Sequence, residues 1–254
     1  MHGPNELLVQ QAADLWRKSK YQVAFTGAGI SVPSGIPDFR SPGGIWSKYD
    51  PMQVATAQAL VKNPRGVWEF MLDTLQMLDS SDPNPAHLAL ADMEKNGWLQ
   101  GVITQNIDNL HQRAGSATVV EYHGNFQRFY CARCNVQISL EEIRKLAQEQ
   151  IPVICGSCQG FIRPDVVFFG EPIPQEAQAL SVKLMRRTDL LIIAGTSGEV
   201  APANMLPREV KMQGGWIIEI NLGQTHYQDI SDIKIDAPVQ DVLPHLAELV
   251  RSTG

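Results

Sequence analysis

The chain has 254 residues, of which 44% are hydrophobic and 19% charged, and its formal net charge is -6 at pH 7. This length and composition are typical of a globular protein with a large core, and the acidic balance argues against a nucleic-acid-binding protein, which normally presents a basic face. The sequence contains neither a run of the roughly 20 apolar residues that cross a bilayer nor a secretory signal at its start. We therefore expect a cytoplasmic protein that binds neither nucleic acid nor a membrane, and we expect it to be a monomer.

The first part of the chain combines a helix, a strand and a long loop. Apolar residues at helical spacing predict a helix over residues 5–19. The apolar run at residues 23–25 predicts a buried strand, which ends at the glycine turn 27–29. Residues 31–46 are dense in Gly, Pro and Ser and predict a loop, and loops of this length are usually functional or disordered.

Later runs of apolar residues predict further strands that end in small or polar residues: 99–108, 119–124, 189–197 and 215–223. Helical patterns cover residues 52–79, with a break at Asn63 and Pro64, and residues 85–97. Strands that are apolar throughout are typical of parallel strands buried on both faces. Their alternation with helices predicts an α/β fold with a doubly wound parallel sheet.

Four cysteines form two C-x2-C pairs separated by twenty residues, and a charged helix is predicted between the pairs at 140–150. The cysteines are Cys131, Cys134, Cys155 and Cys158. Two such turns can complete a tetrahedral zinc site, and because all four ligands come from the protein, the site would be closed and structural. A thiol redox pair and a plain reduced core are the alternatives. The segment interrupts the alternation of strands and helices, which indicates an inserted small domain.

The turn Gly27-Ala28-Gly29 is suited to binding phosphate. It follows a strand, and glycines let the backbone N–H groups approach a pyrophosphate closely. It is only half of the usual dinucleotide fingerprint, because Val32 stands where the third glycine would fall and no acidic residue follows at the expected distance. An ordinary turn between a strand and a loop is the alternative interpretation.

Polar residues follow three of the predicted strands, where an open α/β sheet binds its ligand. They are Thr104 to Asp108, Gly195 to Ser197 and Asn221 to Gly223. Amide and hydroxyl groups are suitable partners for ribose and phosphate. Each group alone is explained as well by helix capping, for example by Asn106 and Asp108. The coincidence of three groups with the glycine turn favours a nucleotide.

His123 differs from the other five histidines. It follows a predicted strand and precedes Gly124 at the junction with the cysteine segment, where a cleft is expected. An imidazole there can act as a general base at neutral pH. His2 is terminal, His245 lies on a predicted amphipathic helix, and His87 and His111 are predicted to be structural.

Together these segments resemble the sirtuin family of NAD-dependent protein deacylases. The matching segments, in the order of the family, are GAGIS (27–31), SGIPDFR (34–40), GGIW (43–46), TQNIDNLH (104–111), HG (123–124), the four cysteines, FFGE (168–171), GTS (195–197) and NLG (221–223). Each is weak alone, but the ordered set spans nearly the whole chain and is highly specific.

The resemblance implies a Rossmann-like doubly wound parallel sheet with an inserted small domain that is part helical and part zinc-binding. The Rossmann-like domain would comprise residues 1–36, 84–123 and 171–254. The inserted domain would comprise the cofactor loop and helices at 37–83 and the zinc-binding module at 124–170. NAD and the acylated lysine would enter the cleft between the two domains.

The resemblance also assigns site residues. The NAD-binding residues would be Gly27, Ala28, Gly29, Ser31, Asp38, Phe39, Arg40, Gln105, Asn106, Ile107, Asp108, Gly195, Thr196, Ser197, Asn221, Leu222, Gly223 and, through its backbone, Val239. The catalytic residues would be His123, as the general base, and Asn106. An acylated-lysine protein or peptide would add as a strand to Val167, Phe168, Phe169, Gly170 and Glu171. One zinc ion would be bound by Cys131, Cys134, Cys155 and Cys158.

The implied reaction transfers the acyl group of a lysine side chain to ADP-ribose, giving free lysine, nicotinamide and O-acyl-ADP-ribose. Mono-ADP-ribosyl transfer, an NAD sensor without catalysis and a dehydrogenase are the alternatives. His123 beside a complete zinc module favours the deacylase over the transferase. The presence of Asn106, Asp108 and His123 together argues against the sensor, and the incomplete glycine fingerprint argues against the dehydrogenase.

Two departures from the family pattern concern the acyl pocket. Met71 and Thr74 stand where relatives that prefer succinyl or malonyl groups have Tyr and Arg. We therefore expect neutral acyl groups to be preferred, and Met71 is a candidate for admitting longer aliphatic chains. Gly198 stands where many relatives have a larger apolar residue, which could loosen the wall on the substrate side.

Overall fold

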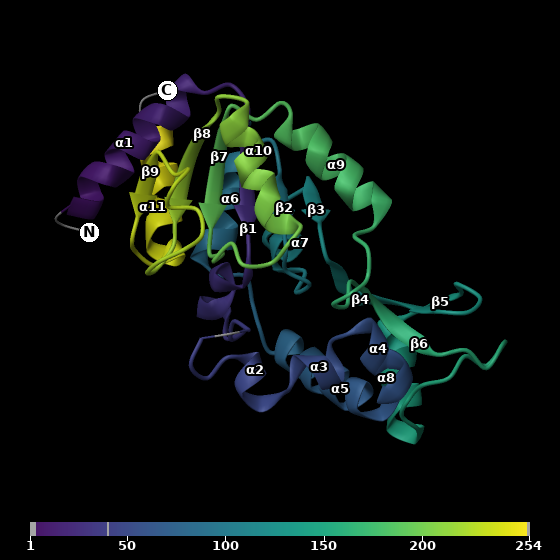
Figure 1. The fold of residues 1–254 in the computed structure, drawn as a ribbon. Helices are drawn as coiled ribbons and strands as arrows, with labels where there is room; N and C mark the ends of the chain where they lie inside the picture. The colour runs from purple at the N-terminus through teal and green to yellow at the C-terminus, as the bar shows by residue number, and fades with distance from the viewer. Residues whose placement is uncertain (1–3, 40, 253–254) are drawn as a thin grey trace.

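A computed structural model of the protein describes residues 4–39 and 41–252. It has a large part built on a six-stranded sheet and a small part built on a three-stranded sheet and short helices (Figure 1). Within the described residues, no helix is both long and apolar enough to span a membrane.

The large sheet is parallel, with the strand order β3-β2-β1-β7-β8-β9. Its strands are β1 (Gln22–Thr26), β2 (Val102–Thr104), β3 (Val119–Glu121), β7 (Leu190–Ala194), β8 (Trp216–Ile220) and β9 (Ile233–Ile235). β1, β2 and β7 are buried along their whole length, as their apolar sequences predict. The chain runs outward in opposite directions from β1, and a ligand crevice is expected at such a switch point.

Helices cover both faces of this sheet, so the predicted doubly wound α/β fold is confirmed. Ala24 and Ile192 pack in one core cluster with α1 (Pro4–Lys18), α6 (Pro85–Lys95) and α11 (Val239–Arg251). On the opposite face, Phe25 and Ile193 pack in a second cluster with α9 (Gln175–Met185) and α10 (Leu206–Met212). The remaining helix of this part, α7 (Leu110–Ala114), follows β2. This alternation along β1 and β7 is what a strand buried on both faces requires.

The small part lies beside the carboxyl ends of β1 and β2 (Figure 1). Its antiparallel sheet contains β4 (Gly124–Cys131), β5 (Gln137–Ile138) and β6 (Ile162–Val166), and its helices are α2 (Ile45–Lys48), α3 (Pro51–Val54), α4 (Ala57–Lys62), α5 (Pro64–Asp79) and α8 (Leu140–Glu149). Trp68, Met71, Phe126, Phe129 and Cys131 belong to its core.

The predicted break at Asn63 has a clear cause. Asn63 ends α4 and caps α5, because its side chain accepts a hydrogen bond from the backbone N–H of Gly66. Pro64 occupies the first position of α5, where its missing N–H is harmless. Two short 3-10 turns that the sequence did not indicate lie earlier in the chain: Ala28–Ile30 overlaps the glycine turn, and Val32–Ser34 lies at the start of the long loop.

Candidate active site

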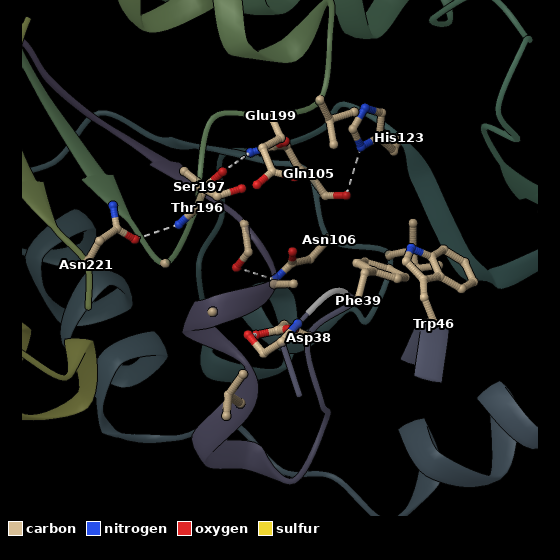
Figure 2. Close-up of a pocket in the computed structure, with 18 of the residues that line it drawn as sticks. Asp38, Phe39, Trp46, Gln105, Asn106, His123, Thr196, Ser197, Glu199 and Asn221 are labelled. Carbon is tan, nitrogen blue, oxygen red and sulfur yellow. Dashed lines mark hydrogen bonds between the residues drawn. The ribbon is translucent and has the colours of Figure 1, made fainter. Parts of the chain in front are cut away.

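A cavity of about 880 Å³ lies at the carboxyl ends of β1, β2, β7 and β8. Residues of both parts line it, from the glycine turn and the loops after β2, β6, β7 and β8 to the short helices of the small part. Its polar side chains gather around Asn221, Thr196 and Gln105, whereas Phe39 and Trp46 lie toward the other end (Figure 2).

The glycine turn fits closely against the loop that follows β7. A Cβ atom on Gly27 would lie 2.6 Å from the Cβ of Thr196. One on Gly29 would lie 2.9 Å from the Cα of Gly195, and Gly195 itself has a φ of +65°. A Cβ on Gly195 would lie 2.2 Å from the backbone nitrogen of Ile30. Only glycine fits these positions, so the cavity is left with a wall of bare backbone that a pyrophosphate can approach.

We expect Gly195→Ala to lower the affinity for NAD at least about tenfold, because the new methyl group pushes the two loops apart. Calorimetric titration of the metal-loaded protein with NAD measures the effect. Gly214→Ala is the matched control: its φ of +84° imposes the same left-handed strain, but no atom lies within 4 Å of the added Cβ. Equal NAD affinities in the two variants would contradict the assignment.

Asn106 forms part of the cavity floor and is held by buried groups. Its Nδ2 donates to the carbonyl of Gly27 and to Oγ of Ser31, each at 3.1 Å. Ser31 in turn donates to the carboxylate of Asp108 at 2.7 Å. Asp108 also accepts from the backbone N–H of Leu110 at 2.9 Å. Burial raises the pKa of Asp108, while these hydrogen bonds oppose the shift.

His123 faces the cavity with one nitrogen committed to the backbone. Its Nδ1 lies 3.0 Å from the carbonyl oxygen of Gln105, which can only accept, so Nδ1 carries the proton of the neutral ring (Figure 2). Burial lowers the pKa of His123, and the Gln105 hydrogen bond raises it less. The ring is therefore neutral at pH 7, and Nε2 can accept a proton from a group bound in the cavity.

A second set of hydrogen bonds fixes the polar end of the cavity. Nε2 of Gln105 donates to Oγ1 of Thr196 at 2.9 Å. The backbone N–H of Thr196 donates to Oδ1 of Asn221 at 2.7 Å, and Nδ2 of Asn221 donates to buried Glu219 at 3.3 Å. The orientation of the Asn221 amide is thus determined, because the backbone N–H of Thr196 can only donate and the carboxylate of Glu219 accepts.

Aromatic side chains form the other end of the cavity. Trp46 lies at the centre of this group, with ring centroids 5.2 Å from Phe39, 6.0 Å from Phe70 and 6.4 Å from Phe169. Phe126 lines the same cavity from β4. Such a wall can hold an apolar chain and exclude water from the reacting groups.

The segment 166–171 joins the cavity to the small part. The backbone N–H of Phe169 donates to Ala55, and its carbonyl accepts from Ala57, at 2.9 and 3.0 Å. The carboxylate of Glu171 pairs with the guanidinium of Arg163 at 2.5 and 2.7 Å and accepts from the backbone N–H of Phe168. Glu171 therefore holds the segment in shape.

The four cysteines lie together in the small part, and none of them lines the cavity. Their Sγ atoms all lie within 4.8 Å of one another, with 3.4 Å between Cys131 and Cys158 and 3.8 Å between Cys134 and Cys155. A zinc ion about 2.3 Å from four tetrahedral sulfurs separates them by about 3.8 Å. The cysteines therefore fit one zinc ion, and the ion would be structural because no substrate can reach it from the cavity.

His87 and His111 pack against each other behind the cavity, with ring centroids 4.8 Å apart. Burial lowers the pKa of His87 to about 4 and that of His111 well below its ordinary value. Nε2 of His111 bonds Oγ1 of Thr26 at 2.9 Å, but its buried Nδ1 has no partner among the described residues. The prediction that both are satisfied structural groups is thus wrong for one nitrogen of His111.

Residues 27–202 match the family model described as the Sir2 family. The chain belongs to this family. It is 44% identical over 239 residues to the NAD-dependent protein deacylase 2 of Pyrobaculum aerophilum, with 94% of each chain covered. It is also 44% identical over 243 residues to the NAD-dependent protein deacetylase of Sulfurisphaera tokodaii, with 95% of this chain and 96% of the relative covered.

Solved structures agree with this sirtuin assignment. A structure described as the basis for the mechanism and regulation of Sir2 enzymes has a TM-score of 0.90 and 41% identity, covering 97% of this chain and 98% of its own. A Sir2 histidine-to-alanine variant with deacetylated p53 peptide and 3'-O-acetyl ADP ribose has a TM-score of 0.89 and 39% identity, with the same coverage.

Most cofactor residues predicted for this sirtuin line the cavity. Ser31, Asp108 and Gly223 do not: the first two lie one layer behind Asn106, and the backbone of Gly223 bonds Asp236 and Lys234. Arg40 lies outside the described residues. The predicted substrate residues, Val167 to Glu171, all line the cavity, as does His123.

The sequence did not indicate Trp46, Phe70 or Phe126 as cavity residues, because they come from elements distant in the chain. Met71, proposed to admit longer acyl chains, is fully buried in the core of the small part and does not line the cavity; its neighbour Phe70 does. Gly198 packs against Tyr227, whose ring carbons would lie 2.9 Å from an added Cβ, so a larger residue has no room there.

Proposed function

We propose that this protein removes neutral acyl groups from lysine side chains of proteins, using NAD, and forms nicotinamide and O-acyl-ADP-ribose. The observation that carries the proposal is the place of His123. Its available Nε2 faces a single cavity that has hydrogen-bonding groups at one end and an aromatic wall at the other. The names of the relatives, deacylase and deacetylase, agree with this function and do not favour the alternative of protein ADP-ribosylation.

The polar end of the cavity would hold NAD. The bare backbone of Gly27 and Gly29 would lie against the phosphates, and Thr196, Ser197 and Asn221 would bind the adenosine part. When bound, NAD supplies an electrophilic ribose carbon from which nicotinamide can leave. The remaining predicted contacts would complete the site, among them Arg40.

His123 would act as the general base in this site. With Nδ1 donating to Gln105, Nε2 is positioned to take a proton from a ribose hydroxyl. Asn106, whose amide is held by Gly27 and Ser31, would orient the ribose and any water beside it. The aromatic residues around Trp46 would exclude bulk water from the reacting groups.

The acylated lysine would enter along residues 167–171. The backbone of Phe169 is already paired with Ala55 and Ala57, so a substrate strand would have to pair with the residues on either side of it. We also propose, from the sequence, that the protein acts in the cytoplasm as a monomer.

The charges around the cavity favour neutral acyl groups. Among the described lining residues, Asp38, Glu171 and Glu199 are acidic and none is Lys or Arg. Among the described residues, a succinyl carboxylate would therefore find no Lys or Arg in the cavity lining to bind it. We expect kcat/KM for a succinyl-lysine peptide to be at least about tenfold below that for the acetyl peptide, a difference of about 1.4 kcal/mol.

Competition between acetyl, octanoyl and succinyl forms of one peptide, followed by mass spectrometry with and without NAD, measures this preference. NAD-dependent loss of the acetyl group supports the proposed function. Equal or faster removal of the succinyl group would contradict the preference for neutral groups. A protein that carries ADP-ribose while the peptide keeps its acyl group would replace the deacylase by the transferase.

A further inference from the structure

The short connection between β3 and β4 contains His123, and the carboxylate of Glu121 bridges its two ends from outside the cavity. β3 ends at Glu121 and β4 begins at Gly124, so His123 lies between the large sheet and the small part. The side chain of Glu121 is 16% exposed and does not line the cavity. It accepts hydrogen bonds from Gln112 on α7 and from Asn125 and Arg128 on β4.

We propose that Glu121 is a positioning residue that fixes His123 through Asn125. The bond from Nδ2 of Asn125 to the Glu121 carboxylate bridges the ends of the connection, with Tyr122, His123 and Gly124 between them. Gln112 and Arg128 hold the same carboxylate, each at 2.6 Å. The inference rests on the proposed function, because it assigns His123 as the base.

This cluster depends on an acceptor at position 121. All three partners approach with N–H groups, and a carboxylate oxygen accepts. Gln112 and Asn125 share Oε1 of Glu121, while half-exposed Arg128 binds Oε2, so removal of the side chain leaves both amides without this acceptor. Burying an unmatched donor in this way weakens the cluster more than the loss of a single bond would.

Backbone hydrogen bonds also hold the connection: the N–H of Tyr122 donates to Thr104, and the carbonyl of His123 accepts from Val167, each at 2.9 Å. Gly124 has a φ of +81°, and a Cβ on it would lie 2.0 Å from the carbonyl oxygen of Asp165. The pairing of β4 with β6 then shifts register between Asn125 and Phe129. Regular strand pairing is thus interrupted after Asn125, where the side chains of Asn125 and Arg128 bind Glu121.

Asn125 itself is 3% exposed and has a determined orientation. Its Nδ2 also contacts Oδ1 of Asn109 at 3.0 Å, and its Oδ1 accepts from the backbone N–H of Gln127 at 2.8 Å. Arg128 additionally donates to Asp165 on β6 at 2.8 Å. Glu121 therefore contacts α7 and β4 directly and is linked to β6 through Arg128. Glu121 itself lies close to His123 in the chain.

Loss of these contacts should displace the imidazole while leaving the cofactor pocket unchanged. The Nδ1 bond to Gln105 is a single contact, and a displacement of about 1 Å at a catalytic group can lower the rate about 100-fold. The groups proposed to bind NAD lie on other strands, so the affinity of the protein for NAD should not change.

The test is Glu121→Ala in the zinc-loaded protein, because this change removes the oxygen that accepts from Asn125. We expect kcat for deacetylation to fall at least about tenfold, with KM for NAD and the calorimetric Kd for NAD within about twofold of the unaltered protein. Zinc content and thermal midpoint report the fold. Glu141→Ala is the matched control, because Glu141 is 80% exposed and pairs with Lys145 on the surface of α8; this variant should keep full activity.

Asn125→Ala removes the same hydrogen bond from its other end, and the double variant with Glu121→Ala completes the comparison. We expect kcat to fall as far in Asn125→Ala as in Glu121→Ala and no further in the double variant, so Asn125→Ala keeps the test valid if Glu121→Ala folds poorly. Unchanged kcat in a folded Glu121→Ala or Asn125→Ala variant would overturn the inference, as would a parallel loss of kcat and NAD affinity. An inactive unaltered protein would instead refute the proposed function.

Discussion

Replacing His123 with alanine should lower kcat for NAD-dependent deacetylation at least about 100-fold, because a positioned general base typically contributes a factor of about 10² to 10⁴. Zinc content and thermal midpoint should remain close to those of the unaltered protein, since the cysteine cluster lies outside the cavity that His123 lines. Steady-state rates on an acetyl-lysine peptide, together with a thermal melt, measure both effects.

The pH dependence of kcat/KM for the unaltered protein should reflect the protonation of His123. Because burial lowers the pKa of His123 from 6.5, kcat/KM should rise with pH through a pKa below 6.5 and level off above it. His245→Ala is the control, since His245 pairs with Glu6 on the surface; this variant should keep both the rate and the acid limb. Normal turnover in His123→Ala would show that another group is the base.

Replacing Cys131 with serine should remove the zinc and destabilise the protein by several kcal/mol. Cys131 is fully buried and belongs to the core cluster of the small part, with Phe129 and Ile162. Metal binding to such a site is part of the free energy of folding. For a chain of this length each kcal/mol lowers the thermal midpoint by roughly 2–4 °C, so we expect a fall of about 10 °C or more.

Zinc content by atomic absorption and a thermal melt of the same sample check this expectation. A strong chelator added to the unaltered protein should produce a similar fall, which separates the effect of the metal from that of the substitution. A stable variant that contains no zinc, or an unaltered protein that binds none, would contradict the structural zinc site.

The large sheet could be predicted from the sequence because most of its strands can be recognised from their own residues. Runs such as Leu190–Ala194 are apolar throughout, and a strand buried on both faces requires that pattern. β9, Ile233–Ile235, was missed because three residues with a lysine in the middle carry no such signal. The cysteines were found because their spacing alone defines a zinc site.

The walls of the cavity could not be predicted in the same way. Trp46, Phe70 and Phe126 meet only after the loop, α5 and β4 have packed together. Likewise, nothing local distinguishes Ser31, which supports Asn106 from behind, from a residue that lines the cavity. The contacts of Glu121 with Gln112 and Asn125 could not be predicted either, although these residues are near in the sequence, because they depend on how α7 and β4 pack beside β3.

The most direct test of the proposed function is to incubate the purified protein with an acetyl-lysine peptide, with and without NAD, and to quantify all products by mass spectrometry. Deacetylated peptide, nicotinamide and O-acetyl-ADP-ribose should form in equal amounts, and only when NAD is present. Deacetylation without NAD, or release of free acetate in place of O-acetyl-ADP-ribose, would contradict acyl transfer to ADP-ribose in this cavity.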